Sequence, residues 1–181
     1  TLTFPLPTER YSGGILNSIG NTPLVKLLRY LDHTDVKLFA KLEAANPGGS
    51  AKDRPALLMI ETGLRSGAIE SGTTIVESSS GNMGIGLAQA CRYHGLPFIC
   101  VVDPNAQAHN LGIMKALGAD VRVVTNPENG DFLSARLTLV RQLLETIPNA
   151  FWPNQYQNLQ NPCSHQVGTI REIDEALEGQ L

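Results

Sequence analysis

Short apolar segments alternate with longer amphipathic ones along most of the chain. Apolar runs that are short, or that alternate with polar residues at period two, indicate strands, whereas apolar residues repeated every three or four positions indicate helices. We therefore expect strands at 24–28, 36–42, 74–77, 98–102, 121–124 and 150–152. We expect helices at 52–66, 82–94, 108–117, 132–146 and 165–177, the third of them ending at Gly118.

From residue 74 onward, strands and helices follow one another in strict alternation. Neighbouring parallel strands need long crossover connections, which helices usually supply. The order of the elements therefore predicts an α/β fold, in which a parallel sheet is covered by helices on both faces and the crossovers are right-handed.

The composition is that of a globular protein with a sizeable core. The chain has 181 residues, of which 42% are hydrophobic and 17% are charged. A net charge of −3 without a basic block disfavours nucleic acid and anionic membranes as partners. The longest apolar runs, such as 96–102, are too short to span a bilayer, and residues 1–10 show no secretory signal.

The cysteines and histidines indicate neither a disulfide framework nor a metal site. Cys91, Cys100 and Cys163 are odd in number and lack the spacing of metal ligands, and the four histidines are scattered. We therefore expect buried thiols in a reducing compartment, and hence a cytoplasmic protein.

The stretch 46–54, Asn-Pro-Gly-Gly-Ser-Ala-Lys-Asp-Arg, places a lysine between a turn and a helix. Residues 47–49 break regular structure, and Ser50 is expected to cap the helix that follows. The positive end of the helix dipole disfavours a second positive charge, so the setting of Lys52 favours a neutral, nucleophilic amine. A lysine without this context would simply be exposed.

A second stretch, 77–86, reads Glu-Ser-Ser-Ser-Gly-Asn-Met-Gly-Ile-Gly and lies between a strand and a helix. Hydroxyl groups and backbone N–H groups at such a junction suit a bound anion, either a phosphate or a carboxylate. The glycines do not follow the dinucleotide-binding order, and 48–53 does not match a nucleotide-binding P-loop. The serines could also serve as a linker or a cap.

A third stretch, 152–165, is dense in amides. Amides are costly in a core and useful in recognition, although Gln155 and Asn158 could also satisfy the backbone of a loop.

Together these stretches resemble three motifs of the cysteine synthase and cystathionine beta-synthase family, the fold-type II enzymes dependent on pyridoxal 5′-phosphate (PLP). The resemblance runs in order from about residue 20 to residue 173. It implies the tryptophan synthase beta-like fold, small amino-acid substrates, PLP as the cofactor and a homodimeric assembly. In this family, the lysine that matches Lys52 forms the Schiff base with the cofactor, which makes Lys52 the expected catalytic residue.

The resemblance also implies further site residues. The family's asparagine that matches Asn82 bonds the phenolic oxygen of the cofactor. The substrate-binding positions of the family fall on Ser79, Ser80, Gly81, Asn82, Met83 and Gln155, of which Met83 departs from the usual threonine. Arg136 lies on the expected helix 132–146, where an exposed arginine is the simple interpretation; alternatively, it reaches the mouth of the site and recognises a second anionic substrate.

The phosphate-binding loop of the family and its partner for the pyridine nitrogen come later than residue 181. We therefore expect the chain to be the N-terminal part of such an enzyme. Residues 1–45 would contribute strands to the larger cofactor domain, 46–150 would form the smaller α/β domain, and 151–181 would begin the return into the larger domain.

The function implied is a transferase that catalyses β-replacement on an O-activated L-serine. The residues at 83, 101–105 and 152–156 are more similar to those of the siderophore-pathway branch. That branch joins O-phosphoserine to the amino group of L-glutamate to make a diaminopropionate precursor. The alternatives are a cysteine synthase that uses O-acetylserine and sulfide, and a truncated non-catalytic partner or regulatory relative. The sequence of residues 46–54 argues against the dehydratase relatives, which catalyse elimination or isomerisation.

Overall fold

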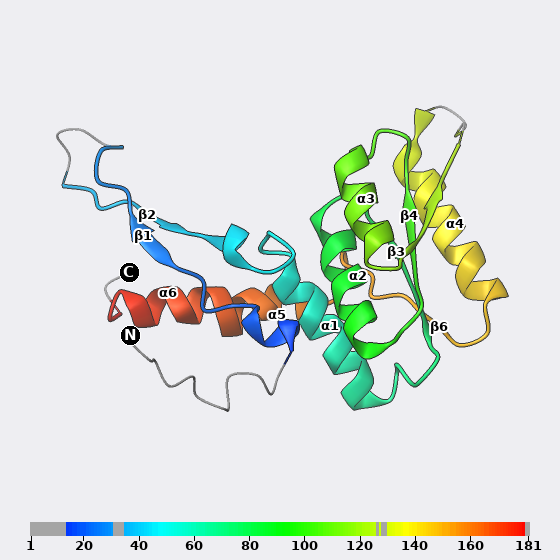
Figure 1. Cartoon of the computed structure of the whole chain (residues 1–181), viewed down its shortest axis with the longest axis horizontal. Coiled ribbons are helices and arrows are strands. Elements are labelled where there is room, and N and C mark those ends of the chain that lie inside the picture. The colour runs from blue at the N-terminus through cyan, green and yellow to red at the C-terminus, as the bar shows by residue number, and fades with distance from the viewer. Residues whose placement is uncertain (1–13, 31–34, 126, 128–129, 180–181) are drawn as a thin grey trace, which may run out of the picture.

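A computed structural model describes residues 14–30, 35–125, 127 and 130–179 of the chain. It shows an α/β unit from which a narrower arm extends, and the arm combines the early and the late parts of the described chain (Figure 1). Within this part of the chain, no helix is long and apolar enough to cross a membrane.

The sheet of the α/β unit is parallel, as the alternation of elements predicts. Within the described residues it holds four strands in the order β5-β4-β3-β6. Their bounds are Thr74–Ser78 for β3, Phe98–Val102 for β4, Asp120–Val123 for β5 and Ala150–Phe151 for β6. Ile75 pairs with Phe98 of β4 and with Phe151 of β6, so β3 lies at the centre beside both.

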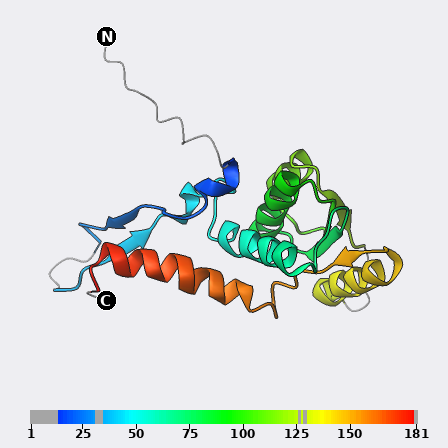
Figure 2. The same ribbon diagram turned by 90° about the horizontal axis from the view of Figure 1, so that it is seen from below.

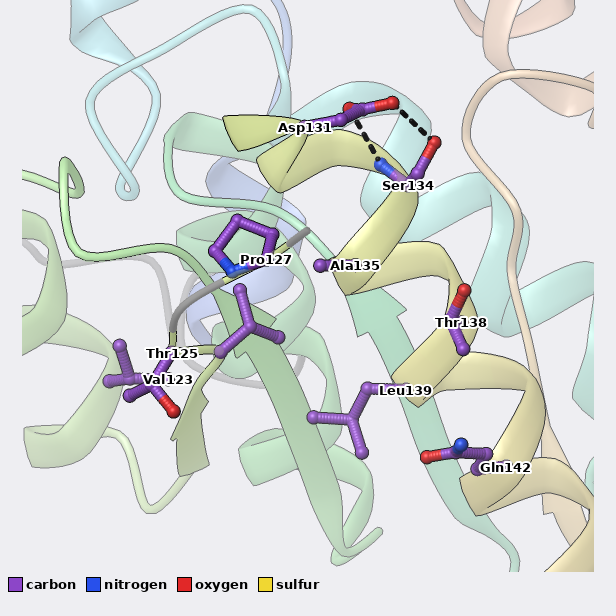
Figure 3. Close-up of a pocket in the computed structure, with 10 residues that line it drawn as sticks. Val123, Thr125, Pro127, Asp131, Ser134, Ala135, Thr138, Leu139 and Gln142 are labelled. Atoms are coloured by element: carbon purple, nitrogen blue, oxygen red, sulfur yellow. Dashed lines mark hydrogen bonds between the residues drawn. The ribbon is translucent and has the colours of Figure 1, made fainter. Parts of the chain in front are cut away.

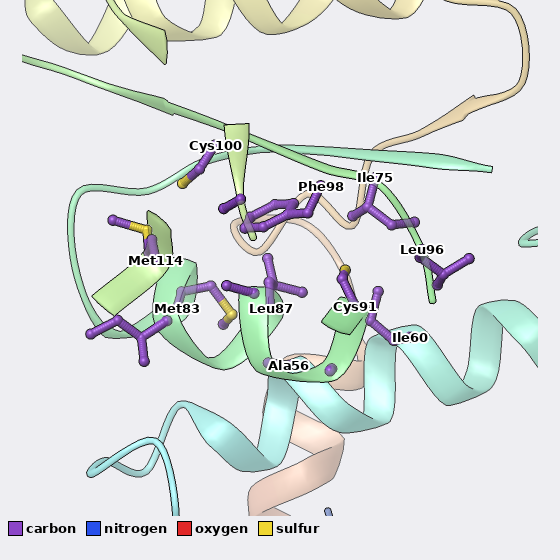
Figure 4. Packing of buried hydrophobic residues seen from close by; sticks show 14 of the residues in the cluster. Ala56, Ile60, Ile75, Met83, Leu87, Cys91, Leu96, Phe98, Cys100 and Met114 are labelled. Atoms are coloured by element: carbon purple, nitrogen blue, oxygen red, sulfur yellow. The ribbon is translucent and has the colours of Figure 1, made fainter. Parts of the chain in front are cut away.

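Helices cover both faces of this sheet. The helices α2 (Asn82–His94) and α3 (Ala108–Ala116) lie on one face, and α4 (Phe132–Thr146) lies on the other (Figure 1). Every residue of β4 is buried: Phe98 and Cys100 point into the core beneath α2 and α3, while Ile99 and Val101 point into the core beneath α4. Figure 4 shows the first of these cores, which Met83, Leu87 and Met114 fill from the helical side.

The end of helix α3 follows its predicted chemistry. Gly118 adopts φ +92°, the left-handed conformation that glycine accommodates without strain. The N–H groups of Gly118 and Ala119 donate to the carbonyl groups of Lys115 and Met114, which would otherwise have no partner at the helix end. The predicted position of Gly118 just beyond the helix is therefore confirmed.

The arm contains strands that the prediction of parallel sheets did not describe correctly. Strands β1 (Leu24–Lys26) and β2 (Phe39–Lys41) are shorter than expected and pair antiparallel with each other in a separate sheet. Antiparallel neighbours need no helical crossover between them, and the described residues on either side of this connection, 27–30 and 35–38, contain no helix. The predicted parallel pairing is confirmed for β3, β4, β5 and β6.

The last helix begins earlier than the expected residue 165. Helix α5 (Gln160–Ser164), a π-helical segment (His165–Ile170) and α6 (Arg171–Ala176) run on from one another and lie along β1 and β2 in both views (Figures 1 and 2). Pro162 is accommodated because it occupies the first turn of α5, where no N–H is required. A π-helical segment inside a helix often marks a functional site.

Helix α1 (Asp53–Ser66) packs closely on α2 at Gly86. A Cβ atom at Gly86 would lie 2.9 Å from the Ala56 Cβ and 3.1 Å from the carbonyl oxygen of Lys52. The absence of a side chain at Gly86 therefore sets how near the beginning of α1, and Lys52 with it, lies to α2.

We expect Gly86→Ala to lower the free energy of unfolding by about 1–3 kcal/mol, because the added methyl group must push α1 away from α2. Gly112→Ala in α3 is the matched control: a Cβ atom there meets nothing within 4 Å. That substitution should stabilise the protein by about 0.5–1 kcal/mol. Urea unfolding of both variants measures the difference, and equal effects would contradict the close contact at Gly86.

Candidate active site

The turn before Lys52 is held by the side chain of its first residue. Asn46 is buried, and its Nδ2 donates to the carbonyl oxygen of Ser50 at 3.0 Å. The Oδ1 atom of Asn46 accepts from the backbone N–H of Gly20 at 2.8 Å. Gly49 adopts φ +81°, which glycine supplies without strain. One amide therefore closes the turn and ties it to the N-terminal segment.

The side chain of Ser50 bonds an N–H group before the helix, and not one in its first turn as predicted. Helix α1 begins at Asp53, and Lys52 itself is the residue at its N-terminal boundary. The Oγ atom of Ser50 accepts the N–H of Lys52 at 3.1 Å and reaches no N–H of the first helical turn. The expected helix cap at Ser50 is therefore wrong, because its hydroxyl is used within the turn. The predicted place of Lys52 at the helix N-terminus is correct.

Asp53 is a fully buried carboxyl group in the lysine motif. Its Oδ2 atom accepts the backbone N–H of Gly48, whereas its Oδ1 atom is buried and has no hydrogen-bond partner among the described residues. Burial raises the pKa of Asp53 to about 6; the bond from Gly48 lowers it, and the charge of Glu43 raises it further. A Cβ atom at Gly48 would collide with this carboxyl group.

The amine of Lys52 is partly exposed and has no hydrogen bond or ion pair with any residue that the structure describes. The ring of His165 lies near enough to be affected by it. Burial, followed by the positive charges of Lys52 and Arg54, lowers the pKa of His165, whose Nδ1 lies 3.0 Å from Thr169 Oγ1. The N-terminal end of α1 therefore presents a free amine near a neutral imidazole.

The loop after β3 supplies the second predicted group of residues. The Oγ atom of Ser79 accepts the N–H of Gly84 at 3.0 Å, so it caps the first turn of α2. Asn82, the first residue of α2, is exposed, and its side-chain amide has no partner within the described chain. The capping interpretation of the serines thus holds for Ser79, while Asn82 keeps its amide available.

Met83 belongs to the core and not to the surface of the loop. Its side chain is 2% exposed and packs among the residues beneath α2 and α3 (Figure 4). The substitution of methionine for the family's threonine therefore fills space in the interior. The role of Met83 and Gly81 in binding substrate stays a prediction, and for Met83 it is confined to the backbone.

Arg136 is not the exposed helical arginine of the simpler interpretation. Its side chain is 14% exposed, its Nη1 atom donates to Ser80 Oγ at 3.0 Å, and its Nε atom lies 3.4 Å from Asp103 Oδ2. Ser80 Oγ in turn donates to Asp103 Oδ2 at 3.2 Å. The guanidinium group is therefore fixed against the loop between β3 and α2, as the alternative interpretation requires.

A buried carboxyl group joins the second stretch to the third. Glu77 accepts the indole Nε1–H of Trp152 at 2.9 Å and the backbone N–H of Gln155 at 3.1 Å. Burial raises the pKa of Glu77 above its ordinary value, although these hydrogen bonds act in the opposite direction. The Nε2 atom of Gln155 donates to the carbonyl oxygen of Ser78 at 3.0 Å, which places this amide beside the predicted loop.

Two other amides of the third stretch satisfy its own backbone. The Nδ2 atom of Asn158 donates to the carbonyl oxygen of Pro153 at 2.9 Å, and the Nδ2 atom of Asn161 donates to that of Gln155 at 3.0 Å. The backbone interpretation of Asn158 is therefore correct.

These contacts bring the predicted residues together at one edge of the sheet. Parallel strands end at the same edge, where the loop after β3 and the segment after β6 meet. The close approach at Gly86 brings the start of α1 beside α2. An available amine on Lys52 and an available amide on Asn82 fit a cofactor that has an aldehyde and a polar ring substituent.

A groove of the described structure lies elsewhere. It has a volume of about 760 Å³ and lies between the end of β5 and helix α4, lined by residues such as Val124, Ser134 and Leu139 (Figure 3). It includes none of the predicted site residues, so the groove carries no argument about the site.

Sequence reasoning missed several residues that shape this region. Glu77 and Asp103 are buried acids that hold the third stretch and Arg136 in place. Arg54 and Glu172 form an ion pair at 2.6 Å although 118 positions separate them. Arg54 and Asp103 lie inside stretches that carried the resemblance, 46–54 and 101–105, which was a signal for them, although nothing in the sequence indicated which groups they would contact.

Comparison with known proteins identifies the family. Residues 15–181 match the protein family described as pyridoxal-phosphate dependent enzyme. The chain belongs to this family. The predicted family and its cofactor, PLP, are therefore confirmed.

Individual relatives agree with this assignment. The chain is 48% identical over 165 residues to N-(2-amino-2-carboxyethyl)-L-glutamate synthase of Ralstonia nicotianae, covering 91% of this chain and 49% of that protein. The chain thus spans about half the length of this curated relative.

Solved structures of this family resemble the chain as well. A hydrogen sulfide-producing enzyme from Fusobacterium nucleatum superposes with a TM-score of 0.85 at 35% identity, over 92% of this chain and 53% of that one. An O-acetylserine sulfhydrylase from Entamoeba histolytica superposes with a TM-score of 0.83 at 33% identity, over 100% and 54%. The predicted fold class is confirmed, and the chain spans about half the length of these two solved chains.

We expect Asp53→Asn to change how stability depends on pH. The pKa of Asp53 is about 6 in the folded protein and 3.8 ordinarily, so between these values the folded state binds more protons than the unfolded state. The contribution of Asp53 to stability is therefore full below the ordinary pKa and is lost as the pH rises through about 6.

The neutral amide escapes this loss. The free energy of unfolding of the variant, relative to wild type, should increase by on the order of 2 kcal/mol between mildly acidic and mildly alkaline pH. Urea titrations across that range measure it, with Asp120→Asn on the exposed edge of β5 as the control. A difference independent of pH would show that Asp53 ionises normally.

Proposed function

We propose that the complete protein catalyses PLP-dependent β-replacement on an O-activated L-serine. The donor is O-phosphoserine and the nucleophile is the amino group of L-glutamate, which gives a diaminopropionate precursor for a siderophore or a related metabolite. The observation that carries the proposal is the available amine of Lys52, held at a helix N-terminus beside the loop that begins at Ser79.

Two residues of the chain suit the cofactor. Lys52 would hold it through its amine, and Asn82 would donate a hydrogen bond to its ring oxygen. When bound, PLP acts as an electron sink that stabilises negative charge at the α-carbon of an amino acid. The chain supplies the orientation of the groups around that carbon.

Lys52 is also suited to move a proton. With an amino-acid substrate bound, the amine of Lys52 would lie within reach of the α-carbon and would serve as a general base. The lowered pKa of His165 leaves a neutral ring in this region, so the imidazole adds no positive charge beside the amine.

The loop after β3 and Arg136 suit the anionic groups of the two substrates. The backbone N–H groups at the start of α2 suit the carboxylate of the amino-acid donor, because the hydroxyl of Ser80 already donates to Asp103. Arg136, fixed by Ser80 and Asp103, suits the second anionic substrate, L-glutamate. Support for this pair of substrates comes from the 48% identity to a protein named N-(2-amino-2-carboxyethyl)-L-glutamate synthase.

A cysteine synthase that uses O-acetylserine and sulfide is the second candidate. It is supported by the likeness to the O-acetylserine sulfhydrylase from Entamoeba histolytica. Sulfide is small and needs no guanidinium group, so the fixed position of Arg136 favours the amine-coupling reaction. Faster consumption of sulfide with O-acetylserine than of glutamate with O-phosphoserine would reverse this order. A cytoplasmic location and a homodimeric assembly stay predictions.

We expect Lys52→Ala in the complete protein to abolish turnover and covalent attachment of PLP. Mass spectrometry after borohydride reduction measures the attachment, because reduction fixes the cofactor to the amine. Lys115→Ala, an exposed lysine of α3, is the control and should behave as wild type. Turnover that persists without Lys52 would refute the proposed role, and a wild type that never binds PLP would favour a non-catalytic relative.

We expect Arg136→Gln to raise the KM for L-glutamate about 10- to 100-fold, because a charge-assisted pair with a carboxylate is lost. Arg141→Gln changes an exposed arginine on the same helix and should leave both KM values unchanged. Initial rates with each substrate varied in turn make the measurement. An effect confined to O-phosphoserine would show that Arg136 recognises the donor instead.

A further inference from the structure

A buried cluster of charges joins the arm of the molecule to the lysine turn. It consists of two cations and two carboxylates, Lys41, Arg54, Glu43 and Glu172, none of which was assigned a role above. We infer that Arg54 and Glu172 are positioning residues for Lys52: through this cluster they fix the turn from which the amine projects. The inference rests on the proposed function for its catalytic consequence.

Arg54 is the centre of the cluster. Its Nη1 and Nη2 atoms donate to the two carboxylate oxygens of Glu172 at 2.6 and 2.8 Å. Its Nε and Nη2 atoms donate to the two carboxylate oxygens of Glu43 at 2.7 and 2.8 Å. The side chain of Arg54 is 5% exposed, so nearly all of its capacity is used by these two acids. Paired two-point contacts of this kind fix orientation as well as distance.

The cluster is connected to Lys52 by two routes, one along helix α1 and one through the turn before it. Along the helix, Arg54 is two residues from Lys52 in the first turn of α1. Through the turn, Glu43 accepts from Asn46 Nδ2 at 2.9 Å, and the same Nδ2 donates to the carbonyl oxygen of Ser50. Ser50 Oγ then accepts the N–H of Lys52. Residues 43 to 54 are thus closed into a ring by the bond between Glu43 and Arg54.

Glu172 anchors this ring to the last helix. Besides Arg54, it accepts from Lys41 Nζ at 2.6 Å, so it also holds β2. The π-helical segment before it provides the necessary space: a Cβ atom at Gly168 would lie 2.9 Å from Arg54 Nη1. The irregular helix and its glycine therefore let the guanidinium group lie between the turn and α6.

The electrostatics match this arrangement. Hydrogen bonds from Arg54 lower the pKa of Glu172 most, against the effect of burial. The pKa of Glu43 is lowered to about 2, where burial opposes the hydrogen bonds from Arg54, Thr22 and Asn46. Both acids are therefore ionised at neutral pH and balance the two cations. A balanced buried cluster loses its geometry when one member becomes neutral, because the others keep their charges without partners.

The test compares Glu172→Gln with Glu175→Gln in the complete protein. Glu175 lies on the same helix in an exposed pair with Arg171, so it is the matched control. The first readout needs no substrate: the rate of covalent PLP attachment at Lys52, and the pH dependence of the visible absorption of the bound cofactor. The second readout is kcat and KM for β-replacement, with the unfolding temperature measured alongside.

For Glu172→Gln we expect attachment to slow about tenfold, the pH profile to shift, and kcat to fall about 10- to 100-fold with KM within about threefold, because the amine is misplaced but the substrate loop is intact. Glu175→Gln should match wild type. A lowered unfolding temperature with wild-type attachment, pH profile and kcat would overturn the inference.

Should Glu172→Gln not fold, Arg54→Lys is measured in the same way. It retains the charge but loses the two-point contacts. Wild-type attachment in that variant would equally overturn the inference. A wild type that attaches PLP but couples no substrates would refute the proposed function only, since the attachment readout still tests Arg54 and Glu172.

Discussion

The ion pair between Arg54 and Glu172 is the contact on which the arrangement of the described chain depends. It joins the start of α1 to α6, and Lys41 extends it to β2. Charges buried this deeply are tolerated only when each is paired. The backbone segments that carry these residues must therefore come together in one arrangement. The same requirement brings residues from the first third of the chain and from α6 together at the base of the lysine turn.

The α/β unit follows from local rules and was largely predictable. Strand β4 is buried on both faces, as expected for a short apolar strand of a parallel sheet that helices cover on both sides. The lysine motif was predictable for a similar reason, since a turn rich in proline and glycine directly before a helix has few other geometries. The sequence therefore placed Lys52 correctly, although it assigned the hydroxyl of Ser50 to the wrong N–H group.

Contacts between distant residues were not predictable in this way. Glu77 and Trp152 are 75 positions apart, and only the pairing of β3 with β6 brings them to 2.9 Å. Arg136 looked like a surface residue because its helix is amphipathic, yet Asp103 at the end of β4 draws it inward. Periodicity reports which face of an element is buried, whereas such polar contacts depend on register between elements.

The hydroxyl oxygen of Ser79 has a structural role before any ligand binds. It accepts the N–H of Gly84 and so keeps the first turn of α2 in order. A serine hydroxyl also has one O–H to donate, and an anion that accepted it would leave the bond from Gly84 in place. Threonine offers the same oxygen and the same O–H, so an exchange between serine and threonine at this position keeps both the helix and the donor.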